Sequence, residues 1–171
     1  MEKDFTFIDF DGVILDSEQR MLDIKDSMGL LDHKSESEFD QFFEYTNSHP
    51  EIWKDIICNA KEINDSVGII QELERQKRKI AILTKIHTLY EMKVKVEELR
   101  ENRKIQSPVI FVPPGVKKHQ VVIPNLQMLV DDSKKNVRYW IANGGQGRIF
   151  DPSIEQDTDE RVKSLAFLLK R

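Results

Sequence analysis

The chain has 171 residues, of which 39% are hydrophobic and 33% are charged, as expected for one compact domain with room for a small insertion. Its net charge of −4 gives no electrostatic basis for wrapping a nucleic-acid polymer. There is no leader pattern and no run of about 18 apolar residues, and the single cysteine, Cys58, cannot form an internal disulfide. We therefore expect a cytoplasmic protein that does not span a membrane; its oligomeric state stays open.

Five short apolar runs, rich in β-branched residues, predict the strands of one sheet. In chain order they are residues 5–10, 79–84, 108–112, 127–131 and 147–150. From the second run onward, each gap is long enough for a helix or an irregular crossover. This spacing favours an α/β fold, with a parallel sheet whose faces are covered.

The gap between the first two runs is far longer than one crossover requires, which predicts an insertion. Its last part, residues 66–76, has the pattern of a helix that packs on the sheet, with Asn64 or Asp65 as its cap. The part before it contains three further helical patterns, at residues 21–28, 35–45 and 50–60. We interpret these three helices as a small helical cap over the sheet.

The domain boundaries follow from this insertion. We assign residues 1–17 and 62–171 to the core domain and residues 18–61 to the helical cap. Aromatic residues are expected to form a small core within the cap: Phe39, Phe42, Phe43 and Trp53.

Two later helices are predicted from their apolar faces. The helix between the second and third runs has an apolar face made of Leu89, Met92, Val96 and Leu99, while Lys93, Lys95, Glu98 and Arg100 lie mostly elsewhere. Thr158 is a plausible N-cap for a last helix with a broad apolar face that includes Val162, Leu165 and Leu168. We assign these faces to the core.

The first apolar run ends in two carboxylates two residues apart, Asp9 and Asp11. The alternation of side chains along a strand sends both to the same side of the strand end. Ligands of open α/β sheets bind outside the carboxyl ends of the strands. This pair is therefore a candidate site, although paired acids also occur in turns and caps.

Further polar residues follow the other strands. The second run ends at Thr84, and the fourth ends in Asp131 and Asp132. Four carboxylates that converge at one edge of a sheet would repel one another unless a cation lies among them. Mg²⁺ is the best fit, because it binds one or two carboxylates together with a substrate phosphate. Lys117 or Lys118 could neutralise an attacking carboxylate and a phosphoryl group.

The order of these motifs resembles the haloacid dehalogenase (HAD) superfamily of aspartate-nucleophile phosphotransferases. The resemblance covers nearly the whole chain and rests on Asp9-Phe10-Asp11-Gly12-Val13, Thr84, Lys117 or Lys118, and Asp131-Asp132. It implies a Rossmann-like five-stranded parallel sheet in the order 5-4-1-2-3, sandwiched by helices, with a helical cap inserted after strand 1. The stretch from Asp132 to Gly144-Gly145 looks like the deoxynucleotidase-like branch.

The resemblance also implies a role for each motif residue. Asp9 would be the nucleophile and a magnesium ligand, and Asp11 would be general acid and then base, with its carbonyl on the metal. Thr84 would hydrogen-bond a phosphoryl oxygen. Asp132 would ligate Mg²⁺ directly and Asp131 would orient a metal-bound water, although these two roles could be exchanged.

Two motifs depart from the family pattern. Lys85 follows Thr84 where many capped members have Asn, so the role of Lys85 stays open. The third motif is compressed; we favour Lys118 as its lysine, because residues 118–122 resemble the Lys-x-x-Val turn of deoxynucleotidase-like members, and we keep Lys117 as the alternative.

The function implied is a Mg²⁺-dependent phosphatase that hydrolyses a small phosphate monoester through a phospho-aspartate. A small phosphorylated metabolite or a nucleotide, such as a nucleoside monophosphate, is the expected partner, because a cap of this size should enclose something small. The alternatives are a phosphomutase, a phosphonatase-type enzyme, or a non-catalytic protein with the same fold that binds or regulates. Specificity would come from cap residues such as Glu18, Arg20, Phe43 and Trp53.

Overall fold

The structure is a computed structural model that describes residues 5–29 and 36–170, with the backbone alone for residues 36–40. The strands are β1 (Thr6–Ile8), β2 (Ile80–Lys85), β3 (Val109–Val112), β4 (Met128–Asp131), β5 (Gln146–Phe150) and β6 (Arg161–Val162). The α-helices are α1 (Ser17–Ser27), α2 (Glu36–Ser48), α3 (Glu51–Cys58), α4 (Ser66–Arg75), α5 (Leu89–Glu97), α6 (Lys118–Val121) and α7 (Lys134–Ala142). A π-helical turn, η1 (Glu98–Asn102), extends α5, and a 3-10 helix, η2 (Leu165–Lys170), follows β6.

The strands form one parallel sheet in the order β3-β2-β1-β4-β5-β6. The Rossmann-like α/β class is thus present, but the expected count of five strands was wrong. Read from the other edge, the order is 6-5-4-1-2-3. The additional strand, β6, has only two residues, too few to produce an alternating apolar pattern in the sequence.

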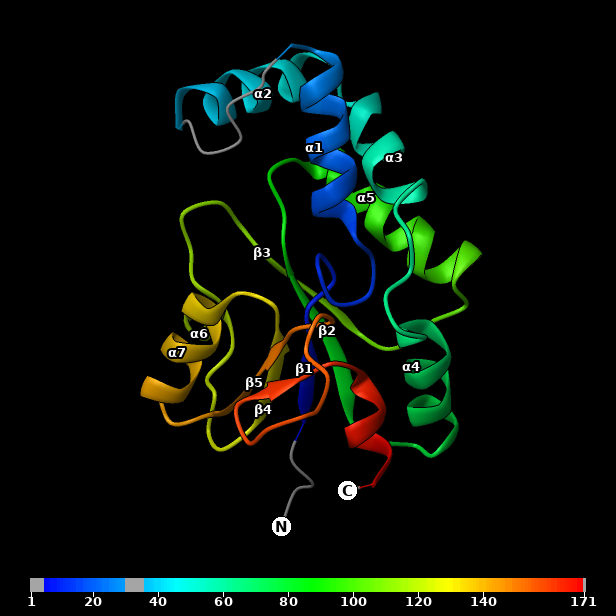
Figure 1. Cartoon of the computed structure of the whole chain (residues 1–171), viewed down its shortest axis with the longest axis vertical. Coiled ribbons are helices and arrows are strands. Elements are labelled where there is room, and N and C mark those ends of the chain that lie inside the picture. Colours follow the sequence, from blue (N-terminus) through cyan, green and yellow to red (C-terminus); the bar gives the residue numbers. More distant parts are fainter. Residues whose placement is uncertain (1–4, 30–35, 171) are drawn as a thin grey trace.

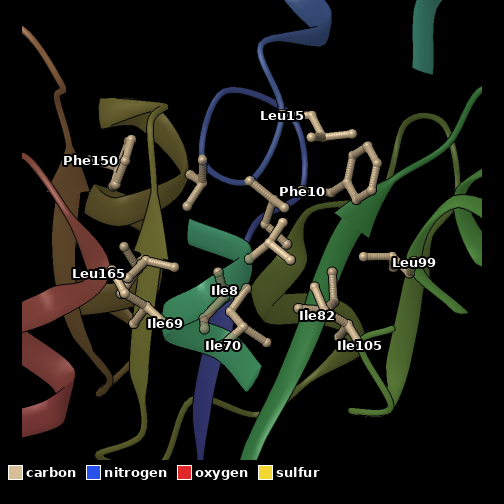
Figure 2. Close-up of a cluster of buried hydrophobic side chains, with 14 of the residues drawn as sticks. Ile8, Phe10, Leu15, Ile69, Ile70, Ile82, Leu99, Ile105, Phe150 and Leu165 are labelled. Atoms are coloured by element: carbon tan, nitrogen blue, oxygen red, sulfur yellow. The ribbon is translucent and has the colours of Figure 1, made fainter. Parts of the chain in front are cut away.

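Both faces of the sheet are buried. Successive side chains of a strand point to opposite sides, and they enter two apolar clusters. On one face, Ile8, Ile82 and Val130 belong to the larger apolar cluster, which includes residues of α4 and η2 (Figure 2). On the other, Phe7, Leu83 and Leu129 pack in a second cluster with Trp140 of α7. Helices therefore cover both sides of the sheet, with α4 and η2 on one side and α6 and α7 on the other (Figure 1).

A tight, buried turn follows β1. Val13, Ile14 and Leu15 are fully buried, and the Gly12 N–H donates to the Leu15 carbonyl at 2.9 Å. Gly12 has φ +70, in the left-handed region that glycine adopts at no steric cost. This turn fixes where the chain leaves the sheet and where α1 begins.

Helices α1, α2 and α3 lie together beyond the carboxyl ends of the central strands (Figure 1). Phe42 and Trp53 are buried there. Arg20 of α1 forms an ion pair with Asp55 of α3, in which Nη2 donates to Oδ1 at 2.8 Å and to Oδ2 at 3.0 Å. The cap boundaries at residues 18–61 stay a prediction. The helical pattern at residues 35–45 corresponds to α2, but its first residue, Ser35, and the side chain of Phe39 lie outside the described residues.

Two sequence-based expectations about helices were wrong in part, although Leu99, Leu165 and Leu168 are buried as expected. The buried face of α5 and η1 contains Glu91, Val94, Lys95, Glu98 and Leu99, whereas Leu89 is 76% exposed. The expected face assumed that charged residues stay in solvent, but here they pair with one another and with the strand ends. The last helix begins at Leu165 rather than after Thr158, whose hydroxyl instead accepts from the N–H groups of Glu160 and Arg161 in a turn.

No helix within the described residues is both long and apolar enough to cross a bilayer.

Candidate active site

The acidic residues expected at the strand ends lie at one edge of the sheet. Asp9 and Asp11 follow β1, Asp131 ends β4, which is the strand beside β1, and Thr84 lies near the end of β2 on the other side of β1. The parallel register aligns Ile8 with Ile82 and Val130, so these ends are level. A hollow of about 410 Å³ at the opposite edge of the sheet is lined by Lys77 and Lys79 among others and is remote from these acids.

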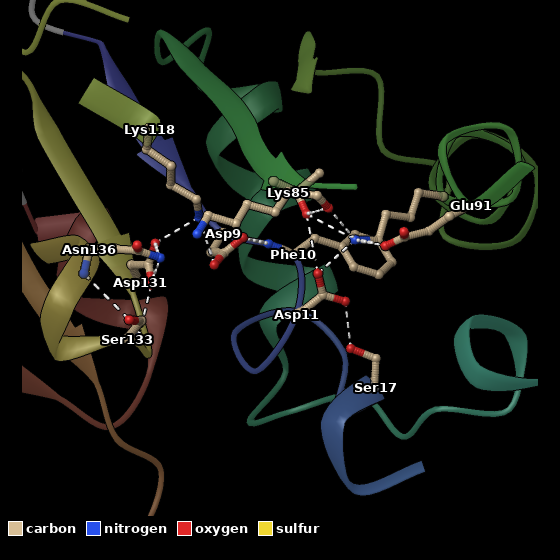
Figure 3. A network of polar contacts seen from close by, with 12 residues as sticks. Asp9, Phe10, Asp11, Ser17, Lys85, Glu91, Lys118, Asp131, Ser133 and Asn136 are labelled. Carbon is tan, nitrogen blue, oxygen red and sulfur yellow. Dashed lines mark hydrogen bonds and ion pairs between the residues drawn. The ribbon is translucent and has the colours of Figure 1, made fainter. Parts of the chain in front are cut away.

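Lys118 is the cation at the centre of the acids (Figure 3). Its Nζ lies 2.6 Å from Asp9 Oδ2 and 2.7 Å from Asp131 Oδ2, and its side chain is 2% exposed. Burial alone would lower the pKa of Lys118, but the charges of Asp9 and Asp131 outweigh burial and raise this pKa. Burial raises the pKa of Asp9 well above its ordinary value, with Lys118 opposing and Asp131 reinforcing the shift.

Asp131 is fully buried and fully hydrogen-bonded. Besides Lys118, it accepts from the N–H of Ser133 at 2.9 Å and from the amide of Asn136 at 3.1 Å on each carboxylate oxygen. Ser133 is also the N-cap of α7, and its hydroxyl accepts from the Asn136 N–H. The first turn of α7 therefore holds this carboxylate in one orientation.

Asp132 has a different environment. Within the part of the chain that the structure describes, no residue forms a hydrogen bond or an ion pair with the Asp132 carboxylate. Burial, together with the charges of Asp131 and Glu18, raises the pKa of Asp132 to about 7. Ligand oxygens of Asp9, Asp131 and Asp132 all lie within 4.8 Å of one another. Such a group of oxygens is a suitable site for a hard divalent cation.

Asp11 lies in a second cluster beside the first. Ser17 donates to its Oδ1 at 2.6 Å, and Oδ2 accepts from Lys95 at 2.6 Å and from the Thr84 hydroxyl at 3.3 Å (Figure 3). Burial would raise the pKa of Asp11, but Lys95, with help from Ser17, holds it below its ordinary value. The Asp11 side chain is 39% exposed, so a ligand can reach it.

The remaining candidates are not brought into this cluster. Lys117 is exposed, with its Nζ 3.9 Å from the centre of the Tyr139 ring, while Lys118 is the lysine that contacts the acids. Lys85 is exposed, and only its backbone carbonyl takes part, as an acceptor for Lys95.

Among the residues suggested for specificity, Glu18 lines a hollow of about 430 Å³ with Gly12 and Asp132. Phe43 and Trp53 stack on His87, with ring centroids 4.5 and 5.4 Å from the His87 ring. Arg20 pairs with Asp55 instead.

Sequence reasoning missed four residues that bind the candidate acids or their partners: Ser17, Glu91, Lys95 and Asn136. A signal for two of them was present, because Glu91 and Lys95 stand four residues apart on one helix in the orientation that favours an ion pair. The spacing alone is equally typical of a solvent-exposed pair, so it did not indicate a site.

Comparison with solved structures gives matches along nearly the whole chain, although neither protein-family models nor curated proteins match its sequence. YfnB of Bacillus subtilis, described as a HAD-hydrolase bound to magnesium, has a TM-score of 0.61 at 11% identity and covers 99% of this chain and 98% of its own. The D,D-heptose 1,7-bisphosphate phosphatase of Burkholderia thailandensis has a TM-score of 0.56 at 13% identity, with 98% and 97% covered. A Thermotoga maritima protein described as a β-phosphoglucomutase has a TM-score of 0.62 at 15% identity, with 98% of both chains covered.

The parallel sheet and the acids at its carboxyl edge define a Rossmann-like α/β protein whose candidate site lies at the strand ends. The solved structures specify the fold further. The chain has the fold of the haloacid dehalogenase superfamily, as its sequence motifs predict.

Proposed function

We propose that this chain is a Mg²⁺-dependent phosphatase that hydrolyses a small phosphate monoester through a phosphorylated Asp9. The observation that carries the proposal is the position of Lys118, which bonds Asp9 and Asp131 beside Asp132, while Asp11 is held separately two residues from Asp9. A nucleophile, a cation and a proton-transferring group thus lie at one strand end. These three effects are the ones that phosphate-ester hydrolysis requires.

The residues fit a magnesium ion. The cluster of Asp9, Asp131 and Asp132 offers only oxygen ligands, which hard cations prefer. Because Lys118, Ser133 and Asn136 already engage Asp131, we assign direct ligation to Asp9, Asp132 and the carbonyl of Asp11. Asp131 would then orient a metal-bound water. When bound, Mg²⁺ supplies charge neutralisation for the phosphoryl group.

In the first step, an Asp9 carboxylate oxygen attacks phosphorus, and the bond between phosphorus and the ester oxygen breaks. The leaving oxygen takes a proton from Asp11 in its acid form. Lys118, 2.6 Å from Asp9, offsets negative charge as the phosphoryl group arrives. We assign to Thr84 a hydrogen bond to a phosphoryl oxygen.

In the second step, water attacks the phosphorus of phospho-Asp9 and passes a proton to Asp11, now a base. The bond from phosphorus to the Asp9 oxygen breaks, its electron pair stays on the carboxylate, and inorganic phosphate leaves. Asp11 thereby regains the proton that it gave up, and the cycle closes.

The substrate proposed is a small phosphorylated metabolite, with nucleoside monophosphates as the first group to test, because the motif following Asp132 resembles deoxynucleotidase-like proteins. A heptose bisphosphate phosphatase is among the proteins of the same fold, which supports phosphate-ester hydrolysis.

A phosphomutase is the second candidate, because a protein described as a β-phosphoglucomutase shares the fold at a TM-score of 0.62.

The test is phosphate release from a panel of nucleoside monophosphates and sugar phosphates, with and without Mg²⁺. A phosphatase releases phosphate only with Mg²⁺, loses activity with EDTA and loses it in Asp9→Asn and Asp11→Asn. Lys117→Met is the control, since its side chain lies over Tyr139 rather than on the acids. Isomerised sugar phosphate without release would instead identify a mutase. Full turnover by Asp9→Asn would disprove the mechanism.

A further inference from the structure

Lys95 is a buried lysine that none of the motifs explains. Its Nζ lies 2.6 Å from Asp11 Oδ2, 2.8 Å from the Lys85 carbonyl, 2.9 Å from Glu91 Oε1 and 3.1 Å from the Thr84 hydroxyl. The side chain is 1% exposed. Four oxygens from α5, β2 and the end of β1 therefore surround one ammonium group.

A purely structural role would require fewer of these contacts. Burying a lysine is costly unless its charge is paired, and Glu91, four residues earlier on α5 and also buried, already provides a pair. Yet the shortest contact of Nζ is to Asp11, a residue 84 positions away whose side chain is partly exposed. The lysine thus connects a buried helix face to the group that we assign to proton transfer.

Glu91 holds Lys95 in place. Its Oε2 accepts from the N–H of His87 at 2.6 Å and contacts the His87 ring nitrogen at 3.2 Å, while Oε1 binds Lys95. The N–H of Glu91 is in turn bonded to the hydroxyl of Thr88, the N-cap of α5. Both carboxylate oxygens of Glu91 are therefore fixed, and Oε1 holds the Lys95 ammonium. Lys95 thus loses little further rotational freedom when it binds Asp11.

Among the described residues, three groups bond to the Asp11 carboxylate, and all are donors: the Ser17 hydroxyl, the Thr84 hydroxyl and the Lys95 ammonium. This arrangement stabilises Asp11 as an acceptor, which is the form needed to take a proton from water. We propose that Lys95 is a positioning residue that holds Asp11 for the hydrolysis of phospho-Asp9. The inference rests on the proposed phosphatase function and assigns to Lys95 the second of its two steps.

The test uses the full chain with Mg²⁺ and p-nitrophenyl phosphate, whose leaving group departs with little help from an acid. The variant is Lys95→Met combined with Glu91→Gln, so that no buried carboxylate remains at position 91 without its lysine; Glu91→Gln alone is the matched control. We expect kcat to fall about 100-fold in the double variant, as for loss of a proton-transfer group. Because phosphorylation of Asp9 is spared, kcat/KM should change less than about threefold, so KM should fall together with kcat. A burst of about one p-nitrophenol per enzyme should precede slow turnover.

The inference would be overturned if kcat and kcat/KM of the double variant fell equally, without a burst. This outcome counts only if the free energy of unfolding of the double variant matches that of Glu91→Gln. An unchanged kcat would also overturn the inference. If the double variant does not fold, Lys95→Gln, which keeps a hydrogen-bond donor beside Glu91, is judged by the same criteria. Failure of the proposed function is distinguishable, because wild-type protein itself would then release no more p-nitrophenol than Asp9→Asn.

Discussion

Two lysines allow several carboxylates to share one strand end. Lys118 lies between Asp9 and Asp131, and Lys95 lies between Asp11 and Glu91, so each pair of acids has one buried ammonium. Removing one partner of a buried ion pair costs roughly 3–5 kcal/mol, because the remaining charge is left without compensation. These buried charges therefore depend on one another for the stability of the fold.

Gly12 illustrates how closely the two acidic strand ends approach. A Cβ at this position would overlap Asp132 Oδ2, and the backbone has φ +70. We expect Gly12→Ala to displace the Asp132 carboxylate and to weaken Mg²⁺ binding, as measured by calorimetric titration. Gly115→Ala is the matched control, because Gly115 has φ +77 and, beyond its chain neighbours, no described residue has an atom within 4 Å of the added methyl group.

Both substitutions carry the strain of a left-handed alanine, about 1–2 kcal/mol in unfolding free energy. Only Gly12→Ala should add a loss of Mg²⁺ affinity. Equal Mg²⁺ affinities in the two variants would show that the contact with Asp132 does not control the metal site.

Asp132 predicts a pH dependence of stability in the metal-free protein. Its pKa rises from 3.8 to about 7 on folding, so the folded state binds the proton more tightly than the unfolded state. The resulting destabilisation is absent below pH 3.8, grows as the pH rises and is complete above about 7. We expect Asp132→Asn to unfold at higher urea concentration than wild type at pH 8 in EDTA.

The advantage of Asp132→Asn should shrink as the pH is lowered from 7 toward 4, and it should disappear at pH 8 when Mg²⁺ is added, because the ion stabilises the ionised carboxylate of the wild type. A difference between the two proteins that does not vary with pH would contradict this origin.

At the scale of elements, α5 joins the sheet to the site through its polar side. Three residues separate the helix from β2, and its buried positions include Glu91 and Lys95. The short connection carries His87, whose ring stacks on Phe43 of α2 and Trp53 of α3. The segment from His87 to Lys95 thus contacts Asp11 as well as α2 and α3.

Capping should therefore matter at the start of α5. The Thr88 hydroxyl accepts from the Glu91 N–H at 3.0 Å. We expect Thr88→Ala to lower the free energy of unfolding by about 1 kcal/mol, the usual cost of a lost N-cap, while Thr88→Ser retains wild-type stability. Urea denaturation provides the measurement. Equal losses in the two variants would indicate that packing of the threonine methyl group, rather than the hydrogen bond, stabilises the helix.

At the scale of the whole molecule, the proposed metal would link residues that are far apart in the chain, since Asp9 follows β1 and Asp132 follows β4. A ligand that binds only the folded state stabilises it by about 2.7 kcal/mol at 100 times its dissociation constant. For a domain of this size, each kcal/mol raises the melting temperature by about 2–4 °C.

We therefore expect saturating Mg²⁺ to raise the melting temperature of the wild-type protein by several degrees, as followed by circular dichroism. The increase should be lost in Asp132→Asn and retained in Lys117→Met. A wild-type melting temperature that is the same in Mg²⁺ and in EDTA would argue against a metal site in the folded protein.

The amino-acid sequence by itself determined the sheet and the acids at its edge. Buried parallel strands appear as continuous apolar runs, so all five longer strands were predictable to within a few residues. Because parallel strands end at one edge, the sequence positions of Asp9, Asp11, Thr84 and Asp131 also indicated that they would meet.

The tertiary structure alone decided which partners these acids have. Lys118 contacts Asp9 and Lys117 does not, and Lys95 turns from the expected solvent side toward Asp11. Neither result follows from local pattern, because a charged residue on a helix is stable in water or beside a buried opposite charge. Only the packing of α5 and α6 against the strand ends determines which of these environments each lysine occupies.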